Sequence, residues 1–217
     1  MTAKGSKSKK AIVYENLKRR IITNSLQPGE PLNEAVLSKE LKTSKTPIRE
    51  AMQQLEKEGF IENFPGKGAF VSRISVEDVL EIFEIREILE CEVIRRVAAR
   101  EDLNVAEAEA VRKRFESSEA DENKTPRSSF KPGDQIHTFV FEAFGNRRLL
   151  EYYQRLQGHI DRMRLYFFSQ LRPERSEQSS LEHLEIVNAL IARDPKRAES
   201  AMRAHLRNAT DYLKRII

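Results

Sequence analysis

Apolar residues recur at helical spacing in three short stretches near the start of the chain. The first stretch predicts a helix over residues 11–24, with an apolar face formed by Ile12, Val13, Leu17 and Ile21. The second predicts a shorter helix over 34–41, capped by Asn33, with Ala35, Leu37 and Leu41 on its inner side. The third begins at Thr46, a good N-cap, with Pro47 in the first helical position, and it buries Ile48, Met52 and Leu55.

Two short runs that follow predict a β-hairpin. Residues 60–63 and 69–72 have the composition of strands, and the Pro-Gly-Lys-Gly sequence at 65–68 forms the turn between them. Upstream, Pro28 and Gly29 suit the two central positions of a type II turn. Three helices and a hairpin make a winged helix-turn-helix, which we place at residues 11–73. Residues 1–10 are polar and basic, and we expect them to be a disordered tail.

The remainder of the chain, residues 74–217, has helical patterning and no predicted strand. Ser75 with Asp78 and Asn104 with Glu107 are placed to cap helices, and Asp194 with Pro195 restarts the chain after a tight joint. The predicted helices cover 76–100, 105–118, 133–144, 147–171, 177–193 and 195–215, and residues 119–132 are predicted to be a loop. The fold class is therefore mainly α, with an N-terminal winged helix-turn-helix and a C-terminal all-α antiparallel bundle of six helices.

Composition narrows the possible classes of protein. The 217 residues contain one cysteine, Cys91, which excludes an internal disulfide framework. No apolar run is long enough for a membrane span, and the basic N-terminus lacks the apolar core of a signal peptide, so we expect a cytoplasmic protein that does not contact a membrane. Residues 1–73 contain 14 Lys and Arg against 8 Asp and Glu, a net +6, and residues 74–217 contain 24 against 26, a net −2. A basic first part on a mildly acidic body favours a partner that is a polyanion.

The third predicted helix has a basic N-terminal end. Lys45, Thr46 and Arg49 cluster there, and Gln53 follows Arg49 by four residues on the face away from the apolar stripe. This end of a recognition helix meets base edges and phosphates of DNA. At the hairpin, Gly66, Lys67 and Gly68 let the backbone approach a groove closely and add a cation. An ordinary solvated basic face is the alternative interpretation.

A family resemblance rests on several motifs over about 60 residues, including Leu26…Pro28-Gly29, Ser44-Lys45-Thr46-Pro47-Ile48-Arg49-Glu50-Ala51 and Gly66-Lys67-Gly68…Phe70-Val71. This segment resembles the DNA-binding domain of the GntR family of bacterial transcription regulators. The resemblance implies that Ser44, Lys45, Thr46, Arg49, Gln53, Gly66, Lys67 and Gly68 contact DNA.

Two departures from the family pattern matter. Lys42-Thr43 replaces the frequent Gly-Val, so either Lys42 adopts a left-handed conformation, at about 1 kcal/mol, or the turn differs. Lys45 replaces the usual Arg and lacks the bidentate fork that reads guanine, so Arg49 becomes the better candidate for base readout.

Histidines are few and regularly placed in the second half. His183 lies 11 residues before Asp194 and His205 lies 11 after it, so both stand about 16 Å from the joint of a helical hairpin. Asp134 and His137 share one face of another helix. An Asp and three His on three helices suit a divalent transition metal such as zinc, nickel or manganese. Ordinary bundle histidines with neutral partners are the alternative.

The second half resembles the ligand-binding domain of the FadR subfamily of GntR regulators, in its VanR-like six-helix branch. The matching elements are His137…Gly145-Asn146, Glu182-His183…Ala189-Leu190…Asp194 and Ala201-Met202…His205-Leu206. The resemblance implies a metal held by three His and an Asp four residues before the first His. Here that position is Gly133. Either Asp134 replaces that Asp, or the metal has three protein ligands, or the site is weak.

Arg86 lies within the apolar stripe of the first helix of this half. A buried cation needs an anion, either the carboxylate of a small effector gripped bidentately or Glu90, four residues on. Arg162 and Arg164 are further candidates for the effector site.

Together these features predict a DNA-binding transcription regulator rather than an enzyme. We expect a homodimer that binds a two-fold operator as a repressor, with affinity tuned by a small carboxylate in the helical domain. Two alternatives remain at this point: a repressor for which the metal itself is the effector, and a metal-dependent hydrolase, for which no general base is placed with certainty.

Overall fold

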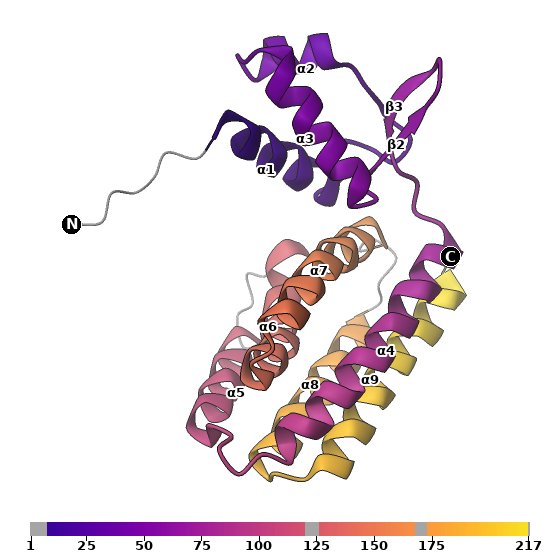
Figure 1. Ribbon diagram of the computed structural model, residues 1–217. Coiled ribbons are helices and arrows are strands. Elements are labelled where there is room, and N and C mark those ends of the chain that lie inside the picture. Colours follow the sequence, from indigo (N-terminus) through magenta and orange to yellow (C-terminus); the bar gives the residue numbers. More distant parts are fainter. Residues whose placement is uncertain (1–7, 120–125, 168–172, 217) are drawn as a thin grey trace, which may run out of the picture. The chain divides into compact units, whose positions relative to one another are not determined.

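A computed structural model describes residues 8–119, 126–167 and 173–216. Within these ranges the chain forms nine helices and three strands (Figure 1). One compact unit holds the residues up to Ile74 together with Asp161–Tyr166, and the other holds Ser75–Ile160 and Phe167–Ile217. Among the described residues, no helix combines the length and the apolar character that crossing a membrane requires.

The first unit is a winged helix-turn-helix, as predicted. Its three helices are α1 (Lys9–Ile22), α2 (Glu34–Glu40) and α3 (Lys45–Lys57). Its antiparallel sheet has the order β1-β3-β2, with β1 (Pro31–Leu32), β2 (Ile61–Phe64) and β3 (Gly68–Val71). Ile61 pairs with Val71 and Phe64 with Gly68, so the hairpin turn lies at residues 65–67. The two-residue strand β1 was not predicted.

The start of α1 corrects one prediction. Ser8 caps this helix by accepting a hydrogen bond from the Ala11 amide (3.2 Å), so Lys9 and Lys10 are helical rather than part of a tail. The other residues of the predicted tail, 1–7, lie outside the described residues.

The core of the first unit lies between α1 and α3. Leu17, Ile21, Ile48 and Leu55 are fully buried in it. Ile12, predicted to face inward, is 55% exposed, because successive helical positions are about 100° apart and Val13 takes the inner position. Ala35 is also exposed, and on α2 only Leu37 is buried.

The loops of the first unit confirm two predictions and correct a third. Gly29 has φ 82° and Glu30 N donates to Gln27 O, as a type II turn requires. Lys42 has φ 49°, the left-handed conformation predicted as one option for the Gly-to-Lys departure. Thr46 is not the N-cap: Ser44 is, and Pro47 occupies the third helical position. Proline is tolerated there because the first amides of a helix have no intrahelical partner.

The second unit contains the remaining helices except for residues Asp161–Tyr166 of α7, which are grouped with the first unit (Figure 1). Helix α4 is in contact with α6 and α9, and α8 is in contact with α5 and α9. The bounds are α4 (Val76–Ala98), α5 (Val105–Glu119), α6 (Pro126–Phe144), α7 (Arg147–Phe167), α8 (Pro173–Ile191) and α9 (Pro195–Ile216).

Helix starts in the second unit were predicted well where a cap marks them. Ser75 and Asp78 form the predicted capping box, and Asp194 accepts from the Arg197 amide (3.0 Å) at the start of α9. The predicted loop at 119–132 is wrong in part, because α6 already begins at Pro126 and residues 120–125 lie outside the described residues. Likewise Pro173 opens α8 rather than ending α7. Both prolines suit a first helical position, which needs no amide hydrogen.

Two of the three isoleucines of α1, Ile12 and Ile21, provide a matched test of the core. We expect Ile21→Ala to lower the free energy of unfolding of the first unit by about 2–5 kcal/mol, because it leaves a cavity in a fully buried position. Ile12→Ala, at a position 55% exposed, removes the same atoms and should lower it by less than about 1 kcal/mol. Urea unfolding followed by circular dichroism measures both. Equal losses would contradict this placement of α1.

Candidate functional site

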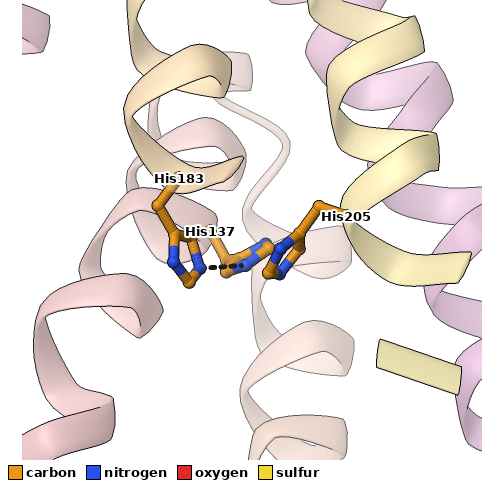
Figure 2. A group of neighbouring side chains, drawn as sticks. All are labelled: His137, His183 and His205. Carbon is orange, nitrogen blue, oxygen red and sulfur yellow. Dashed lines mark hydrogen bonds between the residues drawn. The ribbon is translucent and has the colours of Figure 1, made fainter. Parts of the chain in front are cut away.

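Three histidines from three helices meet in the second unit (Figure 2). His137 comes from α6, His183 from α8 and His205 from α9, and all three are buried. Each offers one ring nitrogen to a group whose nitrogens lie within 4.8 Å of one another. The Nε2 atoms of His137 and His183 are 3.2 Å apart. The predicted convergence of His183 and His205 across the α8–α9 hairpin is therefore present, and His137 joins them.

A buried carboxylate orients the first of these rings. Glu90 on α4 is fully buried, and its Oε2 lies 2.5 Å from His137 Nδ1 while its Oε1 accepts from Arg86 Nε (2.7 Å). Burial raises the pKa of the Glu90 carboxyl, but the charges of Arg86 and His137 outweigh burial and hold that pKa at about 2. Because Glu90 contacts Nδ1 of His137, the other ring nitrogen, Nε2, faces the group of histidines.

A second carboxylate orients His205. Glu182 Oε2 lies 2.8 Å from His205 Nδ1 and also accepts from Arg175 (3.1 Å), while its Oε1 accepts from Asn208 (2.7 Å). Glu90 and Glu182 therefore have the same role. Each contacts Nδ1 of a histidine whose other ring nitrogen faces the group. Sequence reasoning missed both roles. Glu90 was considered only as a partner of Arg86, and Glu182 reaches a histidine 23 residues away, which no local spacing reveals.

The fourth position of the predicted metal site has no side chain. Gly133 is buried one helical turn before His137, and a Cβ placed there would lie 2.5 Å from His183 Cε1 and 2.8 Å from its Nε2. The His183 ring therefore fills the space into which a side chain at 133 would project. Asp134, the predicted replacement, is partly exposed and is not among the residues that form the group.

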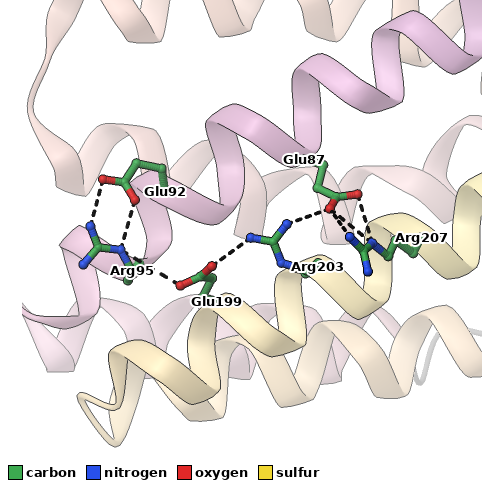
Figure 3. A network of polar contacts seen from close by, with 6 residues as sticks. All are labelled: Glu87, Glu92, Arg95, Glu199, Arg203 and Arg207. Atoms are coloured by element: carbon green, nitrogen blue, oxygen red, sulfur yellow. Dashed lines mark hydrogen bonds and ion pairs between the residues drawn. The ribbon is translucent and has the colours of Figure 1, made fainter.

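The helices that carry Glu90 and His205 are joined by a ladder of ion pairs (Figure 3). Glu87 on α4 accepts from Arg203 (2.6 Å) and Arg207 (2.8 Å) on α9, and the hydrogen bond from Arg207, with that from Arg203, lowers its pKa. The ladder continues through Glu199 and Arg95 to Glu92. Pairs this exposed contribute at most about 1 kcal/mol each, so the ladder adds only modestly to the packing of α4 against α9.

The predicted DNA-binding residues form a second candidate site in the first unit. All eight are exposed: Ser44, Lys45, Thr46, Arg49 and Gln53 at the start and along α3, and Gly66, Lys67 and Gly68 at the hairpin tip. Ser44 makes no side-chain capping hydrogen bond, so the first turn of α3 presents amide groups that an external anion can accept from. Gly66 (φ 76°) and Gly68 (φ 94°) hold conformations that favour glycine, and a Cβ added at either position would have no heavy atom beyond its chain neighbours within 4 Å among the described residues.

Three arginines, Arg86, Arg162 and Arg164, were predicted to bind an effector. Arg86 is 1% exposed and makes the pair with Glu90 that was the alternative interpretation. Its Nη2 is also buried and has no hydrogen-bond partner within the part of the chain that the structure describes. Arg162 and Arg164 both lie on α7, and their part in effector binding stays a prediction.

Comparison with known families gives two matches. Residues 9–71 match the model of the gntR family of bacterial regulatory proteins, and residues 81–208, more than half of the chain, match the model of the FCD domain.

Curated relatives and solved structures agree with these matches. The chain is 28% identical to the HTH-type transcriptional repressor RspR of Escherichia coli, over 94% of this chain and 88% of the relative. It is 28% identical to the HTH-type transcriptional repressor GlaR of E. coli, over 89% and 90% of the two chains. Among solved structures, E. coli McbR/YncC superimposes with a TM-score of 0.75 at 18% identity, covering 97% and 99% of the two chains. A GntR regulator from Rhodococcus gives 0.72 at 24%, over 95% and 97%. At these identities the structures show the fold alone.

Proposed function

The chain belongs to the GntR family of bacterial regulatory proteins and carries an FCD domain, and from this premise we propose that it is a repressor released from its operator by a small carboxylate. The families and relatives that it matches are transcription regulators and not enzymes, so the hydrolase alternative is set aside. That the chain regulates transcription follows from the family. Repression, the effector and a metal are the proposed parts.

The observation that carries DNA binding is the exposure of one set of residues. The N-terminal end of α3 and the tip of the β2–β3 hairpin present their polar and cationic groups to solvent while the apolar face of α3 is buried. In a helix-turn-helix, these are the parts that enter a groove and contact phosphates. A single chain presents one such helix, so a two-fold operator requires two copies, and we propose a homodimer.

Arg49 and Lys67 separate base recognition from phosphate contact. We expect Arg49→Ala to lose about 1–3 kcal/mol of binding to a selected duplex and to relax its sequence preference. Lys67→Ala should weaken the binding of the protein to selected and to random duplexes equally. It should also reduce the slope of log affinity against log salt concentration by about 0.9. Fluorescence anisotropy at several salt concentrations measures both, with two chains expected per duplex. Unchanged binding by Arg49→Ala would contradict the assignment of α3 as recognition helix.

We further propose that the three histidines hold a divalent transition metal. The donors fit: neutral imidazole is a preferred ligand of zinc and nickel, and both His137 and His205 have the carboxylate partner at Nδ1 that metal-binding histidines usually have. Two nitrogens bound to one zinc ion lie about 3.4 Å apart, and His137 and His183 present theirs at 3.2 Å. When bound, such an ion supplies a Lewis-acid position for an oxygen of an anionic ligand.

Histidine substitutions test the metal. His183→Ala and His205→Ala should each lower the metal content measured by elemental analysis, and should lower the metal-dependent gain in stability, about 2.7 kcal/mol at a hundredfold excess over Kd. His159→Ala is the control, since His159 lies outside the group. Asp134→Ala distinguishes a fourth protein ligand from a three-histidine site. If the purified protein contains no zinc, nickel or manganese and binds none on titration, the proposed metal site is wrong.

The effector is proposed to be a carboxylate because of Arg86. Its Nη2 is buried and without a partner among the described residues, and a buried N–H of a cation that lacks an acceptor is costly. Glu90 contacts Arg86 with one carboxylate oxygen and His137 with the other. Arg86 is therefore connected to the group of histidines through this single carboxylate. A small acid could accept from Nη2 and reach that group.

A thermal-shift screen of small carboxylates tests this assignment. We expect at least one acid to raise the melting temperature of the metal-loaded protein, and Arg86→Met to abolish that rise. Arg96→Met is the matched control, because Arg96 lies on the same helix but is exposed and pairs with Glu92. If the metal alone releases DNA and no acid shifts the melting temperature, the metal-sensing alternative is supported instead.

A further inference from the structure

Arg49, the residue expected to read a base, is already held by a carboxylate. Its Nε donates to Glu34 Oε1 (3.0 Å) and its Nη2 donates to Glu34 Oε2 (2.8 Å). Glu34 is the first residue of α2, so the contact joins the two helices of the helix-turn-helix. The hydrogen bond from Arg49 lowers the pKa of the Glu34 carboxyl. The side chains are 62% and 30% exposed, so both remain accessible to a ligand.

The geometry of this pair leaves half of the guanidinium available. A guanidinium has five N–H groups, and the pair with Glu34 uses the edge formed by Nε and one hydrogen of Nη2. The other edge, formed by Nη1 and the second hydrogen of Nη2, carries two parallel N–H groups. Guanine presents O6 and N7 as two acceptors in the major groove, and an arginine pairs with them bidentately. One arginine can therefore hold Glu34 with one edge and guanine with the other.

We propose that Glu34 is a positioning residue that fixes the Arg49 guanidinium for end-on pairing with a guanine of the operator. This inference rests on the proposed function of α3 as recognition helix. Without Glu34, the flexible arginine would be free to turn to the nearest phosphate, a contact that carries no sequence information. The Glu34 carboxylate also repels phosphates, so it weakens binding to unselected DNA while it supports the specific contact.

The test begins from a pool of duplexes with a random centre, from which the full-length protein selects preferred sequences. Anisotropy then gives the affinity for the best duplex, for versions in which each guanine is replaced, and for the random pool. Arg49→Ala should lose about tenfold or more of the preference for one guanine in each half-site. Glu34→Gln should lose most of the preference at that same guanine and should bind the random pool more tightly than the parent does.

Glu40→Gln is the matched control. Glu40 lies on the same helix and its carboxylate accepts from Arg20 (2.9 Å), so the variant removes the same charge without touching Arg49. It should retain the guanine preference. In the Arg49→Ala background, Glu34→Gln should change the base preference no further, which separates positioning from a general disturbance of α2. Thermal unfolding followed by circular dichroism establishes that each variant is folded. Glu34→Ala repeats the test with a variant that lacks the side-chain amide of Glu34→Gln.

The outcomes distinguish this inference from the function on which it rests. If Arg49→Ala loses the guanine preference and Glu34→Gln keeps it, Glu34 does not position Arg49, and the recognition helix stands. If Glu34→Gln strengthens binding to the selected duplex and its preference is unchanged, Glu34 competes with DNA for Arg49, and the inference is wrong. If no duplex is selected from the pool, both the inference and the proposed operator binding are wrong.

Discussion

The buried carboxylate of Glu90 is the constraint on which the arrangement of the second unit depends. An ionised carboxylate removed from water costs several kcal/mol unless opposite charges and hydrogen bonds surround it. Glu90 meets that requirement with Arg86 on its own helix and His137 on α6, one partner for each oxygen. Helices α4 and α6 therefore cannot slide past each other without stranding a charge. Because the same bond fixes the tautomer and orientation of His137, the point at which the rings of His183 and His205 meet it is fixed as well.

The first unit uses an ion pair in the opposite way. The pair between Arg49 and Glu34 is exposed, so its contribution to stability is small and neither partner is trapped. A DNA-binding surface needs side chains such as this arginine, whose orientation is fixed by a neighbour and whose remaining N–H groups stay accessible to DNA. The buried pair of the second unit gives rigidity, and the exposed pair of the first gives orientation. The difference follows from burial and not from the residue types, since both are pairs of an arginine with a glutamate.

Much of this structure could be read from the sequence because the signals are local. Caps, turns and apolar periodicity predicted the winged helix-turn-helix, the capping box at Ser75 and the left-handed option for Lys42. The position of His183 level with His205 followed from helical rise alone. What failed was the choice between neighbouring local signals, as with Ser44 against Thr46 at the start of α3. Contacts between side chains on different helices, such as that of Glu182 on α8 with His205 on α9, could not be predicted, because helical spacing says nothing about which neighbouring helix a side chain faces.

Gly133 is a departure from the family pattern that bears on the proposed metal site. A Cβ there would lie 2.5 Å from His183 Cε1, so the present placement of the His183 ring and a side chain at 133 exclude each other. A divalent ion held by three neutral imidazoles keeps its full charge in the inner sphere, whereas an aspartate ligand would cancel part of it. The carboxylates of Glu90 and Glu182 contact the outer nitrogens of His137 and His205, so they would act on the proposed ligands and not directly on an ion. In the proposed site, an anionic effector would therefore supply the charge that the glycine leaves out, and metal and effector would each bind more tightly in the presence of the other.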